Sequence, residues 1–533
     1  MKLGIVVWAE GTTVRFRILE GVRVERGQLV KVEDAGRTYV MRVYDFKPES
    51  LLTPAEVAAA SHAAARGDRV VLYDQPLRLY DTALATILCQ IEEGGRVQGP
   101  TSVPRLFTPV ESLEREDLEL LRLGTGDLVV GVVRVGHKPS DALVALDGSK
   151  VIPHHVLVCG VTGAGKSNLG KVLAAAFMLA PPRYSLVLFD VESEYLTGSE
   201  PGKYGLAHLP AAEERLFVVT PRVEEPTRLK LELELAGDVV EREVVAHPLK
   251  VDLSSLKPSD FTMTGEFTEP QEEFLWAAYR QLGDEWLEVI TTVDARSIHK
   301  RLGGMAGVNT IAVTKRKVRH LLGTSGIFVP RAPGDLFEAV LGAVREARVV
   351  LFDMPFASEG EEKLLTIAVA RRIFHAYERA RKFSPGEWER LPYVLIAVEE
   401  AHRYLSKQAA GGEVRENIFS TIAKRGRKYK VGALYITQMP GELIETVIRQ
   451  ALTKIILPLP TKPDLQKVIQ YSPYLDEAEQ EIRTLDKGEA LLVSPPSGIR
   501  FAVPVKIFSY EELVEALVLE RGEEARARAP ASG

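Results

Sequence analysis

The 533-residue sequence predicts an α/β protein whose centre is a parallel sheet. From Val156 onward, short apolar runs alternate with helical stretches, which is typical of a parallel sheet covered on both faces. Before that point apolar and polar residues alternate, which indicates antiparallel strands with one buried face. The chain is too long for one hydrophobic core, so two or three domains are expected.

The first 150 residues are expected to form a β-barrel with a helical insertion. Strand-like alternation occurs at 13–18 and returns at 69–73 and 127–135. Between them, Thr53 and Glu56 have the spacing of a capping box, with proline at the first helical position. An alanine-rich helix is therefore predicted from this point to about residue 67.

The apolar run at 156–158 leads into a phosphate-binding loop. The pattern G-x-x-x-x-G-K-S begins at Gly160, and its glycines let backbone N–H groups close around phosphate oxygens. Lys166 is expected to reach the β- and γ-phosphates, and Ser167 to bind Mg²⁺. A helix is predicted from Asn168 to about residue 179, and its dipole favours the same anion. The expected nucleotide-binding residues are Gly160, Thr162, Gly163, Ala164, Gly165, Lys166, Ser167 and Asn168.

A second apolar run, at 393–398, ends in two adjacent carboxylates. Glu399 is expected to hold the water shell of Mg²⁺, and Glu400 to polarise the water that attacks the γ-phosphate. Such a pair marks the additional-glutamate class of RecA-like P-loop NTPases, with ATP as substrate. The alternative is that two glutamates simply begin a helix, where negative charge suits the dipole.

Gln438 and Arg425 complete the predicted catalytic set. Lys166 and Glu400 lie far apart in the chain, which suits a sheet where another strand separates the two motifs. Gln438 ends the next apolar strand, where its amide can sense the γ-phosphate; the alternative is a routine strand-end residue. Arg425 and Arg427 both precede that strand in the basic run 424–430, and either is a candidate to reach a neighbouring subunit's nucleotide; the alternative is that this run is a solvated face. An arginine that reaches a neighbour's nucleotide can raise the rate by ~10³ or more, and it makes the enzyme active only as a ring.

The remaining strands and helices define the expected domain layout. The RecA-like core is expected over 151–257 and 347–515, interrupted by a charge-rich helical subdomain at 258–346. A C-terminal tail is expected at 516–533, frayed from about residue 521.

The composition is that of a soluble globular protein, with 46% hydrophobic and 26% charged residues. No run approaches the ~18 apolar residues of a membrane helix, and charges appear too early for a signal peptide. Two cysteines fit a reducing compartment, so a cytoplasmic location without membrane contact is expected. The net charge of −6 argues against a generally basic surface but permits a local positive lining for nucleic acid.

With these motifs assembled, the chain resembles the HerA family of ATP-driven DNA translocases in the HerA/FtsK superfamily. The segments that carry the resemblance are spread along the chain, at 161–168, 189–195, 399–402, 426–429 and 487–491. The resemblance implies an N-terminal HAS-type barrel, a hexameric ring, double-stranded DNA as substrate and a NurA-type nuclease as partner in end resection. It also implies Asp190 as an acidic active-site residue and Arg425 as the arginine that acts in trans.

The chain departs from the family pattern at two places. The family commonly has Asp-Glu where this chain has Glu399 and Glu400, and hydrolysis should survive the longer carboxylate because it contacts Mg²⁺ through water. The family also has an arginine shortly before the first core strand, where this chain has His154 and His155. One phosphate or intersubunit contact therefore lacks its usual residue.

Three functions are compatible with these motifs. The first is a motor that grips duplex DNA in a central pore, mainly through phosphates, with 406–413 either a pore element or a plain loop. The second is a pump for another polymer, as in conjugation or secretion, against which the lack of a membrane anchor counts. The third is an ATP-controlled scaffold that recruits a partner through its barrel.

Overall fold

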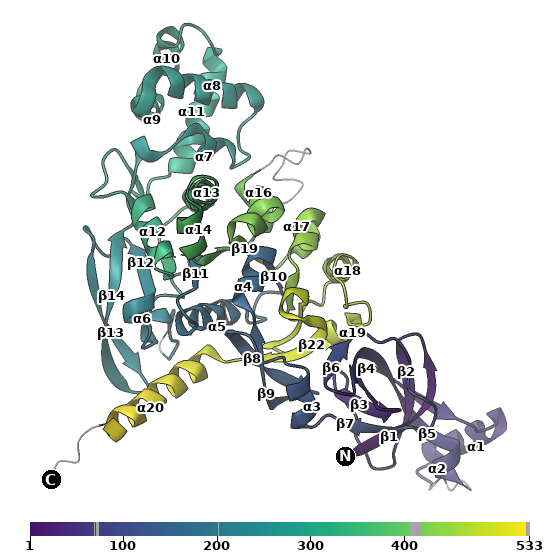
Figure 1. Ribbon diagram of the computed structural model, residues 1–533. Coiled ribbons are helices and arrows are strands. Elements are labelled where there is room, and N and C mark those ends of the chain that lie inside the picture. The colour runs from purple at the N-terminus through teal and green to yellow at the C-terminus, as the bar shows by residue number, and fades with distance from the viewer. Residues whose placement is uncertain (69, 71–73, 201, 406–416, 529–533) are drawn as a thin grey trace, which may run out of the picture.

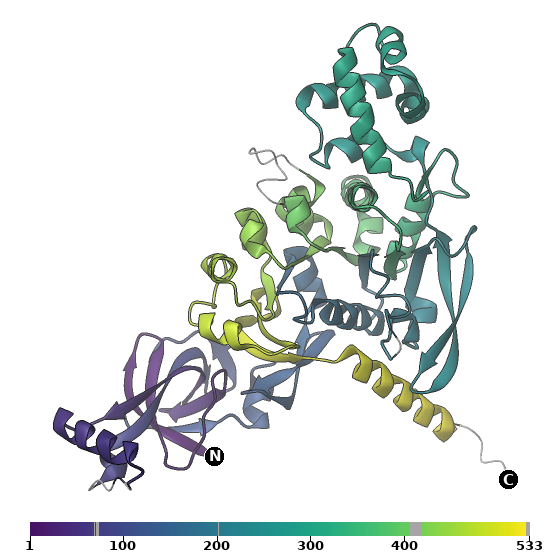
Figure 2. The same cartoon turned by 180° about the vertical axis from the view of Figure 1, so that it is seen from behind.

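The computed structural model describes residues 1–68, 70, 74–200, 202–405 and 417–528. A small barrel and a group of helices lie at opposite ends of the molecule, with a large sheet between them (Figures 1 and 2). The predicted pore element at 406–413 lies outside the described residues.

The N-terminal strands close into a barrel. Their order is β2-β1-β7-β3-β4-β5, and a pairing of β2 with β5 closes the ring. Alternate side chains such as Val14, Phe16 and Met41 fill the interior, because successive residues of a strand point to opposite faces. The strands are β1 (Lys2–Glu10), β2 (Thr13–Ile18), β3 (Leu29–Asp34), β4 (Arg37–Ser50), β5 (Leu79–Glu92), β6 (Arg96–Gln98) and β7 (Pro109–Ser112). β6 pairs with the end of β5 in antiparallel orientation.

The helical insertion starts as predicted. In α1 (Pro54–Ala65) the Glu56 N–H donates to the Thr53 hydroxyl, and the Glu56 carboxylate accepts the Thr53 N–H at 2.8 Å. The capping box is thus confirmed, and α2 (Gln75–Arg78) follows. Of the predicted strand run at 69–73, only residue 70 is described, and it is not in a strand.

The barrel ends earlier than the expected boundary at residue 150. After α3 (Arg115–Leu120), the strands β8 (Leu128–Val135) and β9 (Lys138–Leu146) pair with each other, and β8 pairs with β22 (Ile499–Ile507) in the large sheet. The alternation at 127–135 did identify a strand. It could not reveal a pairing partner near the other end of the chain, since the pattern reports burial and not neighbours.

The large sheet has 13 strands, in the order β13-β14-β12-β17-β11-β18-β19-β10-β20-β21-β22-β8-β9. The strands from β14 to β20 are parallel, which confirms the predicted sheet, and antiparallel strands flank them. The bounds are β10 (Val156–Cys159), β11 (Tyr184–Asp190), β12 (Leu216–Thr220), β13 (Thr227–Leu235), β14 (Asp238–Pro248), β17 (Val349–Asp353), β18 (Tyr393–Val398), β19 (Val431–Thr437), β20 (Thr453–Ile456) and β21 (Glu489–Ser494).

Both faces of the parallel strands are buried by helices. Along β11, Leu186 and Leu188 pack on the side of α5 (Lys166–Leu179), whereas Val187 and Phe189 pack on the side of α13 (Glu359–Phe383). Burial on both faces explains why these strands read as continuous apolar runs. The other core helices are α4 (Gly148–Val151), α6 (Ala212–Arg215), α14 (Pro385–Arg390), α15 (His402–Leu405), α16 (Ile418–Arg425), α17 (Glu445–Gln450), α18 (Lys462–Gln470) and α19 (Glu479–Thr484).

The inserted subdomain is mainly helical, as expected for 258–346. Its last helix, α12 (Leu336–Arg345), contacts β11, β14 and β17 and so packs on the ATPase core instead. Lys315 and Arg319, from the basic run on α11, donate to backbone carbonyls at the end of α9. The remaining elements are α7 (Pro258–Thr262), α8 (Glu269–Leu282), α9 (Trp286–Thr292), α10 (Ala295–Arg301), α11 (Val308–Leu322) and the paired strands β15 (Val251–Asp252) and β16 (Phe328–Val329).

The chain ends in α20 (Tyr510–Arg528), which extends away from the body (Figure 1). The sequence predicted a C-terminal tail at 516–533 that frays from about residue 521, so the helix continues further than expected. Within the described ranges, no helix combines the length and apolarity needed to cross a membrane.

Candidate nucleotide-hydrolysis site

The predicted catalytic motifs meet at one edge of the large sheet. The phosphate loop follows β10, the two glutamates follow β18, and Gln438 follows β19, so all three stand at carboxyl ends of parallel strands. β19 lies between β10 and β18, which confirms the expected separation of the two motif strands. Side chains more than 200 residues apart in the sequence therefore share one site.

The phosphate loop has the backbone that its glycines allow. Gly163 and Gly165 have φ of +79° and +105°, a region strained for other residues. The Lys166 ammonium donates to the carbonyls of Gly160 at 3.1 Å and Val161 at 3.0 Å, so it lies over its own loop. Burial lowers the pKa of Lys166, and the nearby glutamates oppose this shift. The loop thus holds a cation where phosphate oxygens are expected.

Two neighbouring residues at the start of α5 have different surroundings. Ser167 is exposed, as a metal-binding hydroxyl must be. The Asn168 amide donates to the Phe508 carbonyl at 2.8 Å and accepts the Tyr510 N–H at 2.9 Å. The Asn168 side chain therefore ties α5 to the segment between β22 and α20, and only its backbone N–H is left for the predicted nucleotide contact.

Glu399 lies deep in the site beside a tyrosine. Its Oε1 accepts a hydrogen bond from the Tyr195 hydroxyl at 3.0 Å. Burial raises the pKa of Glu399 to about 7; the Tyr195 hydrogen bond opposes the rise, and the Asp190 carboxylate adds to it. A carboxylate held in this way gains from a nearby cation that would favour its charged form.

Glu400 combines an unusual backbone conformation with two carboxylate oxygens in different surroundings. Its φ of +43° is uncommon for a residue other than glycine and is typical of functional sites. Oε1 accepts a hydrogen bond from the Gln438 amide, while His402 Nδ1 lies 3.3 Å from Oε2. Oε2 is buried and accepts no hydrogen bond from the described residues. One carboxylate oxygen is thus held by Gln438, and the other lies beside His402 without a hydrogen bond from the described part of the chain.

Gln438 connects the phosphate loop to this carboxylate. The Thr162 hydroxyl donates to Gln438 Oε1 at 2.5 Å, and the Gln438 amide nitrogen donates to Glu400. One side chain therefore connects the phosphate loop to Glu400.

Asp190 is a buried carboxylate that holds a backbone turn beside the site. It is 2% exposed and accepts the N–H groups of Tyr195 at 2.8 Å and Glu194 at 3.2 Å. Burial raises the pKa of Asp190 to about 6. Asp190 thereby holds the turn that brings the Tyr195 hydroxyl to Glu399. Sequence reasoning gave Tyr195 no role, although the motif at 189–195 included it.

Arg425 lies at the opposite edge of the sheet. It ends α16, before the amino end of β19, and its Nη2 lies 2.6 Å from Glu378 Oε1 on α13. β19 has seven residues. At about 3.3 Å per residue, the strand alone separates Arg425 from Gln438 by roughly 20 Å. The 47% exposed Arg425 side chain is therefore not part of the site in its own chain.

The two histidines that replace the family's arginine do not face the phosphate loop. His155 Nδ1 accepts the Ala433 N–H at 3.2 Å, and Nε2 lies 3.2 Å from the Ala423 carbonyl, to which it donates. Burial lowers the pKa of His155 to about 4, so the ring is neutral. His154 is half-buried, with Nδ1 2.6 Å from the Lys150 carbonyl. His155 thus fastens α16 to β19.

The phosphate loop is also connected to the barrel. In the turn at 486–488, the Gly488 N–H donates to the Ala164 carbonyl at 3.3 Å. From this turn a chain of buried ion pairs runs to β4, namely Glu489–Arg134 at 4.0 Å, Arg134–Glu481 at 2.7 Å and Glu481–Arg42 at 3.4 Å. One hydrogen bond and three buried ion pairs therefore link the phosphate loop to the barrel.

The fold and the site together define a P-loop ATPase of the additional-glutamate class. The criteria are the loop after β10, the carboxylate pair after β18 and the intervening strand that ends in Gln438.

Comparisons with known proteins show similarity to the HerA helicases. Residues 132–373 match the family model described as "Helicase HerA, central domain". The DNA double-strand break repair helicase HerA of Pyrococcus furiosus is 24% identical over 79% of this chain and 77% of its own length. Its counterpart in Sulfurisphaera tokodaii is 22% identical over 83% of this chain and 81% of its own length. The chain is related to the HerA helicases, which confirms the resemblance inferred from its motifs.

Solved structures with some similarity are the plasmid coupling protein TrwB in complex with GDPNP and VirB4 of Thermoanaerobacter pseudethanolicus. TrwB is 13% identical, with a TM-score of 0.44 over 68% of this chain and 88% of that one. VirB4 is 16% identical, with a TM-score of 0.44 over 73% of this chain and 98% of that one.

Proposed function

We propose that this chain is an ATP-driven translocase and helicase that assembles as a ring, most simply of six subunits, and moves double-stranded DNA through a central pore. One observation carries the ring: the site holds a base, a sensor and a phosphate-binding lysine, whereas Arg425 lies roughly 20 Å away along β19. An arginine so placed can reach a nucleotide only in a neighbouring subunit. The names of the HerA relatives, which specify DNA double-strand break repair, support DNA as the substrate.

The residues of the site divide the chemistry of hydrolysis among them. Lys166 and the loop N–H groups bind the phosphates, and Glu400 orients the attacking water and takes its proton. Gln438 fixes the Glu400 carboxylate and, through Thr162, detects whether the γ-phosphate is present. Arg425 of the next subunit stabilises the charge that develops on the equatorial oxygens.

The site fits a magnesium ion. Ser167 offers an exposed hydroxyl, and Glu399 offers a half-buried carboxylate beside Tyr195. Both are the oxygen donors that Mg²⁺ prefers. When bound, the ion neutralises charge on the β- and γ-phosphates.

The cellular role proposed for this motor is DNA end resection together with a NurA-type nuclease. Two relatives whose printed names specify double-strand break repair support this role. Co-purification of the chain with a NurA-type nuclease from the same organism tests the partnership, and a nuclease that neither binds nor changes DNA-stimulated ATP turnover contradicts it.

DNA-stimulated ATP hydrolysis is the direct test of the motor. Turnover should rise on addition of long duplex DNA, and Glu400→Gln should lower kcat by about 10²–10⁴ while nucleotide binding persists. A motor should then stop moving on DNA but remain a ring. A pump for another polymer or a scaffold predicts the same turnover with duplexes, single strands and ends, so that result would sink the proposal.

A further inference from the structure

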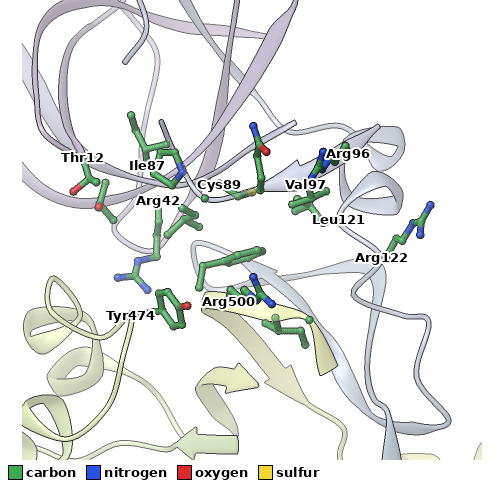
Figure 3. Close-up of a pocket in the computed structure, with 18 of the residues that line it drawn as sticks. Thr12, Arg42, Ile87, Cys89, Arg96, Val97, Leu121, Arg122, Tyr474 and Arg500 are labelled. Carbon is green, nitrogen blue, oxygen red and sulfur yellow. The ribbon is translucent and has the colours of Figure 1, made fainter. Parts of the chain in front are cut away.

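A second candidate site lies between the barrel and the large sheet, away from the phosphate loop. It is a cavity of about 1080 Å³, lined by strands β4–β6, the turn after α3, the segment 474–477 and the start of β22 (Figure 3). Because its walls come from both bodies, the cavity exists only while the barrel is seated on the core.

Exposed arginines line the cavity on both sides: Arg96 and Arg122 lie on one side, and Arg500 lies nearer to Tyr474 on the other (Figure 3). These arginines come from three separate segments, and all three are exposed. In the part of the chain that the structure describes, no carboxylate lies within ion-pair distance of these guanidinium groups. Arg42, which also lines the cavity, is buried and lies 3.4 Å from Glu481. The three exposed arginines therefore keep their donors for a ligand.

The cavity also offers a stacking surface and acceptors. Tyr474 is 44% exposed and stands across the cavity from Arg96 and Arg122 (Figure 3). Asp476 and Glu477 belong to the same segment. Carboxylates repel phosphates but accept hydrogen bonds from the amino groups of bases. Hydroxyl groups, which commonly contact nucleic-acid backbones, come from Thr12, Thr86, Thr125 and Ser497.

We propose that this cavity binds a single strand of nucleic acid, with the backbone at the three arginines and a base stacked on Tyr474. The inference rests on the proposed function only in taking nucleic acid as the substrate. A positively charged groove joined to an exposed aromatic ring is the usual way of binding unpaired strands. A duplex hides its base faces and could not use Tyr474. An acidic peptide would satisfy the arginines but would also meet Asp476 and Glu477.

The test measures binding of a labelled oligothymidylate of about 12 nucleotides to the full-length protein by fluorescence anisotropy at several salt concentrations. The variant Arg96→Gln/Arg122→Gln/Arg500→Gln should bind at least about tenfold more weakly. Its slope of log affinity against log salt should fall by about 2, since each lost phosphate contact on a single strand contributes about 0.7.

A matched control removes the same charge elsewhere. Arg228, Lys230 and Arg242 lie on the β13–β14 hairpin, at the far edge of the sheet from the cavity. Their triple glutamine variant should bind like the parent chain. If both triple variants bind the oligonucleotide equally, the cavity is not the site.

Variants of Tyr474 distinguish base stacking from general electrostatic attraction. Tyr474→Ala should weaken binding by about tenfold, because stacking one base on an aromatic ring contributes substantially, while Tyr474→Phe should retain it. If polyglutamate displaces the oligonucleotide and Tyr474→Ala has no effect, the cavity is a surface for acidic protein segments and the inference is overturned.

Failure of this inference is distinct from failure of the proposed function. Duplex-stimulated ATP turnover, measured on the same preparations, should be present in the parent chain. If the triple arginine variant keeps both turnover and oligonucleotide binding, only the cavity assignment is lost. If the parent chain shows no stimulation by DNA, the proposed function is lost.

Discussion

The two edges of the parallel sheet are built in opposite ways. At the carboxyl edge, Glu400 keeps a buried oxygen without a hydrogen bond, and burial raises the pKa of Glu399. At the amino edge, both ring nitrogens of His155 are bonded. Lys430 there donates to three carbonyls at the end of α14. Of these described residues, Glu400 has a buried oxygen without a hydrogen bond, whereas the polar side-chain atoms of His155 and Lys430 are all bonded.

This difference suggests that the carboxyl edge is suited to chemistry and that the amino edge is suited to holding side chains rigidly. Unsatisfied buried groups cost stability, and they persist where a substrate or ion completes them. Satisfied groups hold Arg425 in position at the end of α16. A ring would bring the rigid edge of one subunit to the reactive edge of the next, which is the arrangement that the following predictions test.

The largest effect is expected from Arg425→Ala. If the arginine completes a neighbour's site, kcat should fall by about 10³ or more while nucleotide affinity in isolated subunits is unchanged. The measurement is steady-state ATP turnover beside nucleotide binding.

Mixing subunits of two inactive variants provides the control for Arg425→Ala. Subunits with Lys166→Ala cannot bind nucleotide well but carry an intact Arg425. Mixed rings of the two inactive variants should recover part of the activity, because an intact site then meets an intact arginine. Absence of recovery in rings shown to be mixed would count against action in trans.

A smaller loss is expected from Gln438→Ala. Without the amide, Glu400 loses the hydrogen bond that fixes it and Thr162 loses its acceptor. Misplacement of a catalytic group by about 1 Å can cost ~10² in rate, so kcat should fall by about that factor with little change in nucleotide affinity. Thr162→Val serves as a control for the loop contact alone; a loss confined to affinity contradicts the assigned role of Gln438.

His155→Phe should affect stability more than catalysis. The substitution leaves the Ala433 N–H and the Ala423 carbonyl without partners, at about 1–3 kcal/mol in the free energy of unfolding. Chemical denaturation measures this loss. Nucleotide affinity should stay within a few fold, because the ring lies at the other edge; a large drop in affinity would place His155 in the phosphate site after all.

The smallest effect concerns pH. The pKa of Glu399 rises from its ordinary value of 4.5 to about 7 in the folded chain, so the folded state keeps a proton that the unfolded state has released. Stability should therefore fall as pH rises through that window. In the absence of nucleotide and Mg²⁺, Glu399→Gln should raise the melting temperature by a few degrees at about pH 8 and leave it unchanged at about pH 4. An equal shift at both pH values would contradict this account.

Local motifs were predictable because their geometry depends on adjacent residues. The loop from Gly160 to Ser167 and the pair Glu399 and Glu400 were identified from spacing and from the apolar runs before them. The capping box at Thr53 was predictable for the same reason.

Side-chain partners were not predictable, since they come from distant segments. Asn168 was expected to contact nucleotide, but its amide binds the backbone near Tyr510. Asp190 was inferred only by resemblance, and the structure shows it holding the turn of Tyr195. The position of β8 in the large sheet depends on β22, so no pattern within residues 1–150 could place it.

The sequence by itself determined the class of enzyme and its phosphate chemistry, because a phosphate loop and a carboxylate pair are short segments with intrinsic backbone preferences. Only the tertiary structure decided that Gln438 joins loop to base, that Arg425 stands at the opposite edge, and that arginines from three segments line one cavity. The physical reason is that hydrogen bonds and charges act over a few ångströms of space, and a parallel sheet brings together residues that the chain keeps far apart.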